Sequence, residues 1–201
     1  MWRTTDAKAP NTFTSGPRWS QIKSLGNGKI SAIAIDPLAS DHVWVGHETG
    51  EIWRSINATD SSPSWVRINN YGSDPLDVSR YCHHIEVSPH NSADVLVTFG
   101  DYASGNVWRT RDKGLTWVNI SATLPEAPVR SATFHPAKDT WIYIGTEVGV
   151  FASEDFGVTW SPSNEGPANV SVDDLKWLGN TLVCITHGRG VFTIDLNHVG
   201  F

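Results

Sequence analysis

Apolar and polar residues alternate with a period of two in short runs along most of the chain, a pattern typical of half-buried β-strands. The clearest runs open four segments of the sequence: ISAIAIDP (30–37), HHIEVSPH (83–90), RSATFHPA (130–137) and VDDLKWLG (172–179). Each is followed by a second apolar run, a turn containing small or polar residues, and a third run, without a helical period between them. The pattern therefore predicts an all-β chain.

A tryptophan-led fourth run completes the repeated unit, most clearly in SWVRI (64–68) and TWVNI (116–120). The same order of four short strands recurs about every 40 to 55 residues, as in the blades of a β-propeller. A sandwich or a barrel does not require such repetition. We therefore predict a single propeller domain (1–201) of about four to five antiparallel, four-stranded blades. Its expected parts are a partial blade (1–22), three blades (23–68, 69–121 and 122–163) and a last blade lacking its outer strand (164–201).

One turn motif precedes the fourth run and occurs twice in full, as TRDKGLTW (110–117) and SEDFGVTW (153–160). Degenerate copies are RTTDAKAPNTFTSGPRW (3–19) and RSINATDSSPSW (54–65), in which Asn57 replaces the Asp. The pattern Ser/Thr-x-Asp-x-Gly-x-Thr-Trp resembles the Asp-box, or BNR, repeat of sialidases, xyloglucanase-type glycoside hydrolases and sortilin-type receptors. The closing THGRGVFTIDL (186–196) resembles the last blade of xyloglucanase-like and sortilin-like propellers. The resemblance covers nearly the whole chain and implies a propeller related to bacterial BNR-repeat glycosyl-hydrolase-like proteins.

The turn motif has a structural explanation. An Asp in a tight turn accepts hydrogen bonds from nearby backbone N–H groups, and Gly adopts positive φ readily. We expect these turns to lie at the end of the blades opposite the binding face, with a structural role for Asp112, Gly114, Trp117, Asp155, Gly157 and Trp160. The tryptophans at repeat positions are expected to pack between blades: Trp2, Trp19, Trp53, Trp65, Trp108, Trp117 and Trp160.

The predicted strands do not close into a simple ring. Residues 1–5 match third strands, 19–22 match a fourth strand, and the last blade supplies first, second and third strands only. Residues 19–22 therefore fit the outer position of the last blade, but 1–5 then duplicate a strand that 191–195 already provide. This duplication indicates either the C-terminal part of a larger propeller or one of two copies that complete each other. Unsealed edges invite pairing, so self-association is expected, with a cyclic head-to-tail homodimer as one route. A four-bladed closure that displaces the first strand is the alternative.

The composition is that of a soluble globular protein, with 39% hydrophobic and 18% charged residues. The net charge of −6 and the lack of Lys/Arg runs argue against a nucleic-acid partner or an acidic-lipid surface. No apolar run approaches a membrane span, and the first ten residues do not resemble a signal peptide, so a soluble protein of unknown location is expected. Cys82 and Cys184 fall in strand-like runs and are expected to be buried free thiols.

The turns between second and third strands and the loops between blades are expected to form the binding face. Alignment on the turn glycines places His47, Asp101 and Tyr102, Glu147, and His187 and Arg189 in comparable turns. The loops between blades add Asp74, Asp77, His83 and His84, Arg130, Asp173 and Asp174. His47, Tyr102, Arg130, His187 and Arg189 are the candidate substrate-binding residues.

Three functions remain open. The first is a hydrolase related to glycoside hydrolases, which use two carboxylates about 5 to 9.5 Å apart; Asp101, Glu147 and Asp173 are the candidates. The second is a Ca²⁺-dependent hydrolase of lactones or esters. Asp101, Glu147 and Asp173 would supply its oxygen ligands, and His84 or His83 would act as the base, although only one ring of this adjacent pair can face the channel. The third is a non-catalytic module that binds a glycan or a protein. The glycoside-hydrolase-like function is favoured, with a carbohydrate or another small molecule as substrate.

Overall fold

The computed structural model describes residues 1–195 except 25, 27, 70–75, 77–78 and 163–166. This part of the chain contains seventeen strands and no helix, hence no helix that could cross a membrane. The all-β prediction is confirmed.

Three sheets consist of four strands in chain order, and every neighbouring pair is antiparallel. Blade 2 contains β3 (Ile30–Asp36), β4 (Ala39–His47), β5 (Ile52–Ser55) and β6 (Val66–Arg67). Blade 3 contains β7 (Tyr81–Val87), β8 (Val95–Gly100), β9 (Val107–Thr110) and β10 (Val118–Asn119). Blade 4 contains β11 (Val129–Phe134), β12 (Ile142–Thr146), β13 (Gly149–Ser153) and β14 (Ser161–Pro162).

The two sheets nearest the chain ends are smaller. Blade 1 is a hairpin of β1 (Trp2–Arg3) and β2 (Ser20–Gln21), paired through Trp2 with Gln21. Blade 5 has three strands among the described residues, β15 (Val172–Leu178), β16 (Thr181–Thr186) and β17 (Gly190–Asp195). These are the strands that the sequence predicts for an unfinished ring.

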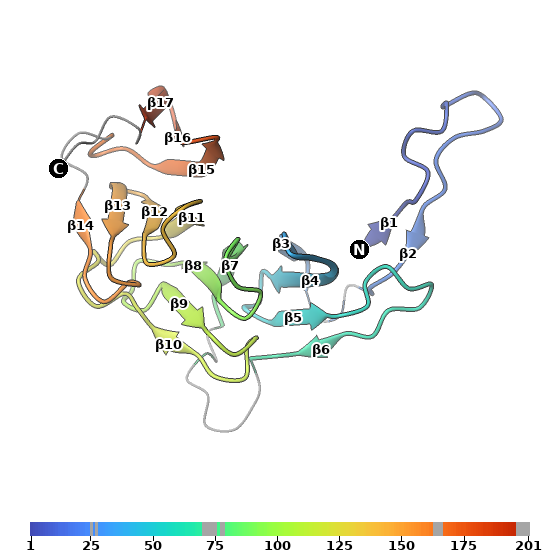
Figure 1. Ribbon diagram of the computed structural model, residues 1–201, viewed down its shortest axis with the longest axis horizontal. Coiled ribbons are helices and arrows are strands. Elements are labelled where there is room, and N and C mark those ends of the chain that lie inside the picture. The colour runs from blue at the N-terminus through green and yellow to red at the C-terminus, as the bar shows by residue number, and fades with distance from the viewer. Residues whose placement is uncertain (25, 27, 70–75, 77–78, 163–166, 196–201) are drawn as a thin grey trace.

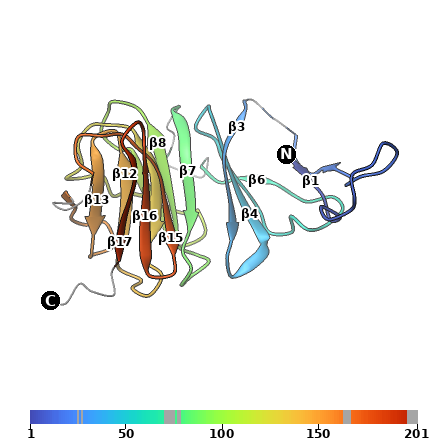
Figure 2. The same ribbon diagram turned by 90° about the horizontal axis from the view of Figure 1, so that it is seen from above.

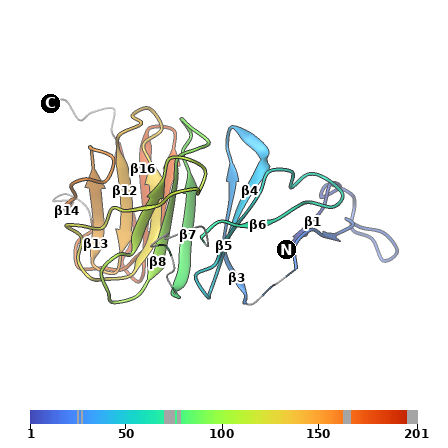
Figure 3. The same cartoon turned by 90° about the horizontal axis from the view of Figure 1, so that it is seen from below.

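The blades stand side by side in an open arc, with blade 1 at one end and blade 5 at the other (Figure 1). First strands form the inner side of the arc, where β3 contacts β7, β7 contacts β11, and β11 contacts β15. Views from above and below show the stacked blades and the hairpin that projects beyond blade 2 (Figures 2 and 3). The strand β2 pairs with β1 and not with β17, so the alternative of a four-bladed closure is not adopted.

The hydrophobic core lies in layers between successive blades. Trp44 and Ile52 of blade 2 pack with Ile85 and Val97 of blade 3 in one such layer, and two similar layers join blades 3 to 4 and 4 to 5. The blades approach so closely that a Cβ on Gly46 would lie 2.4 Å from the Cys82 sulfur. Both cysteines are free and buried, which confirms that prediction.

The two full copies of the turn motif form the same hydrogen bonds. In each, the first hydroxyl donates to the Asp carboxylate and accepts from the Gly N–H. The Thr that precedes the Trp of the motif, Thr116 or Thr159, donates both its N–H and its hydroxyl to that carboxylate. Gly114 and Gly157 have φ of 86° and 87°. The turns are thus self-contained structural units at the end of the blades that carries the β9–β10 and β13–β14 connections.

The degenerate copies keep part of this arrangement despite their insertions. Asn57 accepts hydrogen bonds from Ser55 and from the N–H of Ser64, and Asp6 accepts from Thr4 and from the N–H of Arg18. An intervening loop therefore leaves the contacts at the Asp or Asn side chain in place.

The predicted packing of the tryptophans is observed in blades 3 and 4, is partial for Trp53 and Trp65 of blade 2, and is not observed in blade 1. Trp108, Trp117 and Trp160 are buried, and Trp160 donates its indole N–H to the Ile120 carbonyl at 2.6 Å. Trp2 and Trp19 are each 59% exposed. In the described part of the chain, the hairpin of blade 1 has no inner strands to form a layer around them.

Candidate functional site

Four of the predicted site residues meet where blades 4 and 5 adjoin, at the end of the blades that carries the turns between second and third strands. We call this end the loop face. Arg130 lies in β11, Glu147 directly follows β12, Asp173 lies in β15, and His187 directly follows β16. Residues that are far apart in sequence are thus brought into one polar cluster, which we define by Arg130, Glu147, Asp173 and His187.

Arg130 connects the two acidic residues of the cluster. Its Nε donates to Glu147 Oε1 at 2.7 Å, and its Nη2 donates to the same oxygen. The same Nε lies 3.9 Å from Asp173 Oδ1. Both distances are measured from the same Nε atom, so Glu147 Oε1 and Asp173 Oδ1 are at most about 6.6 Å apart.

The exposed fraction of the side chains increases across the cluster from Glu147 to His187. The Glu147 side chain is 19% exposed, the side chains of Arg130 and Asp173 are 36% and 38% exposed, and that of His187 is 82% exposed. His187 Nδ1 lies 3.3 Å from Asp173 Oδ2. Asp173 therefore lies between the guanidinium of Arg130 and the exposed imidazole of His187.

A β-bulge directs one residue of each first strand toward this face. In β11 the pairing passes from Val129 to Ser131 and leaves Arg130 as the extra residue. The same irregularity leaves His83 unpaired in β7 and Asp173 unpaired in β15. A bulge interrupts the alternation of a strand and turns a side chain away from its regular direction. Three adjacent blades thus present His83, Arg130 and Asp173 at equivalent positions.

His83 belongs to the surroundings of the cluster, whereas its neighbour His84 does not. Burial is the main cause that lowers the pKa of His83; the positive charge of Arg130 lowers it further, and the negative charge of Glu147 opposes this. Glycine at position 100 makes room for the ring, since a Cβ there would lie 2.1 Å from His83 Nε2. The bulge explains which member of the His pair faces the site, and no local pattern of residues 81–87 predicts this bulge.

His84, a predicted catalytic residue, lies elsewhere. Its Nε2 is 3.5 Å from Glu86 Oε2, and it lines a cavity of about 330 Å³ between β3 and β7 that Lys176 also borders. Of the two predicted candidates, His84 thus lies away from the cluster and His83 lies near it, because the bulge shifts the alternation of β7 by one residue.

Asp101 and Tyr102 lie on the turn of blade 3 but outside the cluster. Asp101 is exposed, and its Oδ1 accepts a hydrogen bond from the Tyr102 N–H at 2.7 Å. In the described part of the chain no hydrogen bond or ion pair joins Asp101 to Glu147 or Asp173. Tyr102 is 73% exposed. Asp101 thus fixes its own turn, while the Tyr102 ring remains free for contact with a ligand.

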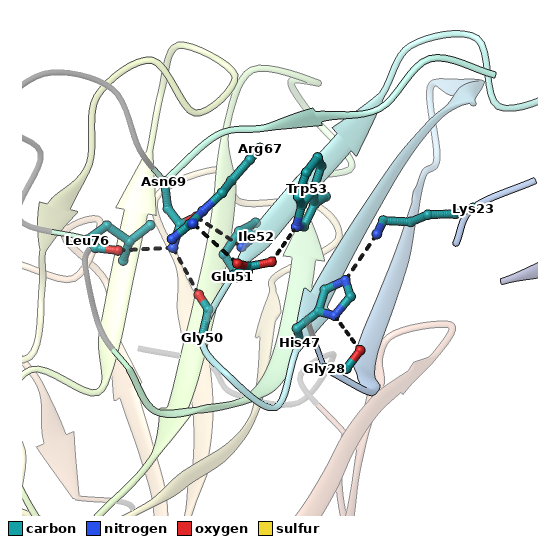
Figure 4. A network of polar contacts seen from close by, with 10 residues as sticks. All are labelled: Lys23, Gly28, His47, Gly50, Glu51, Ile52, Trp53, Arg67, Asn69 and Leu76. Carbon is teal, nitrogen blue, oxygen red and sulfur yellow. Dashed lines mark hydrogen bonds and ion pairs between the residues drawn. The ribbon is translucent and has the colours of Figure 1, made fainter. Parts of the chain in front are cut away.

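His47, a predicted substrate-binding residue, is buried in a polar network of blade 2 (Figure 4). Its Nδ1 lies 3.0 Å from the Gly28 carbonyl and its Nε2 lies 3.2 Å from Lys23 Nζ. Both ring nitrogens are therefore engaged, and burial lowers the pKa of His47 and of Lys23. His47 thus joins the chain segment after β2 to blade 2, and although β4 ends at the loop face, its side chain is buried there.

The same figure shows how the β4–β5 turn is fixed. Glu51 accepts hydrogen bonds from the Trp53 indole and from Arg67, at 3.0 and 3.2 Å. Asn69 donates to the carbonyls of Gly50 and Leu76 and accepts from the N–H of Ile52. The polar groups of this turn are satisfied by one another, so it provides structure and not a binding site.

Two further predictions concern the margin of the face. Arg189 is exposed, and its Nη1 lies 3.5 Å from the Ala168 carbonyl, next to the turn that carries His187. Asp74 and Asp77 lie outside the described residues.

The predicted calcium ligands do not assemble. Glu147 is engaged by Arg130 and Asp173 by His187, while Asp101 is not joined to either. Within the described residues, no three His, Cys, Asp or Glu side chains are grouped as a metal site requires. A cation beside the Arg130 guanidinium would also meet charge repulsion. The residues therefore do not fit the Ca²⁺ site, and we derive no chemistry from it.

No family model and no curated protein sequence matches the chain. Among solved structures, an ancestral GH74 enzyme is similar to 83% of this chain, with 17% identity and a TM-score of 0.63. The GH74 xyloglucanase from Xanthomonas campestris is similar to 83% of the chain, with 16% identity and a TM-score of 0.62. An auxiliary nutrient binding protein from Bacteroides thetaiotaomicron is similar to 84% of the chain, with 15% identity and a TM-score of 0.61.

The match extends over 22%, 29% and 38% of these three proteins. The chain thus spans less than a third of the two GH74 enzymes. At this identity the likeness concerns the fold, and it confirms an all-β propeller of four-stranded antiparallel blades.

Proposed function

We propose that the protein is a hydrolase of the Asp-box propeller group that acts on carbohydrate at the loop face. The observation that carries this proposal is the pair Glu147 and Asp173, two carboxylates held by one guanidinium. Glu147 Oε1 and Asp173 Oδ1 are at most about 6.6 Å apart, a limit compatible with the separation of about 5 to 5.5 Å between the two carboxyl groups of retaining glycosidases.

The surroundings of the two carboxylates suit different tasks. Glu147 is the less exposed, and two N–H groups of Arg130 fix its orientation, as a nucleophile or a base that must meet one face of a sugar requires. Asp173 is half-exposed and contacts His187 at the rim, which connects it to solvent for proton exchange. We assign Glu147 as base or nucleophile and Asp173 as the general acid.

The remaining residues would bind the sugar. Arg130 and His83 bring N–H donors to the floor of the cluster, and the exposed Tyr102 ring offers an apolar surface of the kind on which sugar rings stack. The turn motif and the GH74 neighbours support a carbohydrate substrate. One of these neighbours is a xyloglucanase, so xyloglucan is the first polysaccharide to assay.

The test compares the wild-type chain with Glu147→Gln and Asp173→Asn on xyloglucan and other soluble β-glucans, measuring the reducing ends released. Each variant should lose at least about a hundredfold in kcat, the typical contribution of a positioned acid or base. Glu154→Gln and Asp139→Asn are matched controls, because both residues are exposed at the other end of blade 4. Equal activity of Glu147→Gln and wild type on a responsive substrate would contradict the assignment.

A second candidate is a non-catalytic glycan-binding module. The exposed Tyr102 and the likeness to an auxiliary nutrient binding protein favour it. Calorimetric titration with the same glycans separates the two functions. Binding by the wild-type chain without released products, abolished in Tyr102→Ala and retained in Glu154→Gln, would replace the hydrolase by a binding module.

A further inference from the structure

The two ends of the arc carry exposed apolar surfaces of the kind that the other blades bury against each other. On blade 2, Ile33 and Ile35 of β3 are 53% and 60% exposed. They lie on the sheet face opposite Ala32, which packs toward blade 3. In the inner part of the arc, no described strand of blade 1 covers them.

Blade 5, at the other end of the arc, also has an exposed apolar face. Leu178, Ile185 and Val191 are 75%, 39% and 62% exposed. The strand register places Ile185 next to Val191 on one face, and Leu175 and Cys184 pack toward blade 4 from the other. The exposed set therefore forms the free face of the last blade.

Among the described residues, β17 is the last strand of this blade. Its six residues pair with β16, and none of them is buried. In blades 2, 3 and 4 the third strand is covered by a fourth. An exposed strand edge with apolar residues is a template for pairing with another chain. Within the described residues, blade 5 thus has inner strands without an outer one, and blade 1 has an outer hairpin without inner strands.

We propose that two copies of this chain join head to tail, with the free face of blade 5 of one copy packed against Ile33 and Ile35 of the other. The strand β17 then lies beside the β1–β2 hairpin of the second copy. The same contact forms a second time across a two-fold axis, so the two arcs close into one ring.

Charge supports a contact between unlike ends. The first 23 residues contain four Lys or Arg residues and one Asp, in a chain with a net charge of −6. The hairpin is therefore positive and the remainder of the chain negative, and opposite potentials favour the hairpin of one copy meeting a different part of its partner. Two hairpins placed face to face would repel each other.

Sedimentation velocity over a hundredfold range of concentration tests the proposal. The wild-type chain should sediment as a species of twice its mass. Ile35→Lys and Val191→Lys should each weaken the association at least about tenfold, because a buried unpaired charge opposes packing. Val158→Lys is the matched control, since Val158 is 69% exposed on a turn remote from both ends, and it should associate as the wild type does.

Mixing identifies the head-to-tail arrangement. Ile35→Lys retains an intact blade 5 and Val191→Lys an intact blade 2, so an equimolar mixture should associate more strongly than either variant alone. Association of Val191→Lys at wild-type strength would overturn the proposal in favour of a contact between two copies of blade 2. A wild-type chain that remains a folded monomer at every concentration would overturn it as well, and would assign the free faces to another polypeptide.

Discussion

His83 and Arg130 occupy the same position in neighbouring blades, the extra residue of a β-bulge near the start of the first strand. The bulge in β15 gives Asp173 the same position in the next blade. A repeated irregularity of the backbone thus supplies a repeated place for a functional side chain, and the sequence of each blade determines which chemistry it presents. The polar cluster is a consequence of this repeat.

The first prediction concerns the charge around His83. Burial and Arg130 lower the pKa of His83, and Glu147 raises it. Arg130→Gln should therefore raise the pKa of His83, and Glu147→Gln should lower it further. An NMR titration of the imidazole resonances in the wild type and both variants measures these shifts. The two substitutions control one another because they act in opposite directions; shifts of the same sign in both would contradict the proposed arrangement.

Much of this fold can be predicted from the sequence because each blade repeats its alternation and its turn chemistry. The order of four strands and the pattern of TRDKGLTW are local features, and hydrogen bonds within eight residues determine the turn. The strands of the two incomplete blades were also predictable, because MWRTT and GVFTID match third strands of the other units.

The site was predictable only in part. Arg130, Glu147, Asp173 and His187 were identified because equivalent turns must lie on one face. The choice between His83 and His84 depended on a one-residue bulge, which the alternation does not reveal. His47 was predicted to bind substrate, and its burial was not foreseen because its partners, Lys23 and Gly28, approach from a segment distant in sequence. Strand patterns locate residues within a blade, but not the contacts that bury them.

A second prediction follows from the turn of blade 4. Hydrogen bonds from the Thr159 hydroxyl and N–H are the main cause that lowers the pKa of Asp155, to about 2. A carboxylate with a lowered pKa in the folded state stabilises the fold above its ordinary pKa near 4, and this contribution is lost as the pH falls toward 2. Asp155→Asn should therefore lower Tm at pH 6, by an amount that declines between pH 4 and pH 2.

Thermal unfolding followed by circular dichroism, in steps of pH, measures this difference. Asp139→Asn is the control, because Asp139 is an exposed carboxylate in another turn of the same blade, and its Tm should follow that of the wild type. A difference between Asp155→Asn and wild type that stays constant from pH 6 to pH 2 would show that the charge of Asp155 does not contribute.

The third prediction separates backbone strain from steric contact at the glycine of the same turn. Gly157 has φ of 87°, and a Cβ there would lie 2.6 Å from Ile120 Cδ1. Gly179 also has positive φ, 62°, but nothing within 4 Å of its Cβ position. Gly179→Ala should cost about 1 kcal/mol through strain alone. Gly157→Ala adds an overpacking term of about 1–3 kcal/mol.

Urea unfolding of both variants gives the two free energies. Equal losses would mean that Ile120 moves aside without cost, and the blade interface would then be more adaptable than its packing indicates. A larger loss for Gly157→Ala would establish that the turn is positioned by contact with blade 3.

The fourth prediction concerns the buried ion pair of blade 3. Arg109 Nε donates to Asp94 Oδ1 at 2.7 Å, and Nη2 donates to Oδ2. The side chains are 5% and 10% exposed. A further N–H of Arg109 donates to the Phe156 carbonyl at 2.8 Å and so connects blade 3 to the turn of blade 4. Removing one partner of a buried pair leaves the other charge without compensation, which costs about 3–5 kcal/mol.

Asp94→Leu should therefore reduce the free energy of unfolding by about 3–5 kcal/mol, measured by urea denaturation. The double variant Asp94→Leu with Arg109→Met should recover much of this loss, because apolar side chains of similar size can replace a buried pair at little net cost. Lys29→Met serves as the control. It breaks a contact of 3.9 Å between Lys29 and Glu48, whose side chains are 85% and 37% exposed, and should change stability by less than about 1 kcal/mol. A double variant as unstable as Asp94→Leu would show that the hydrogen bond from Arg109 to the Phe156 carbonyl is the main stabilising contact. Arg109 would then stabilise the junction of blades 3 and 4 more than the interior of blade 3.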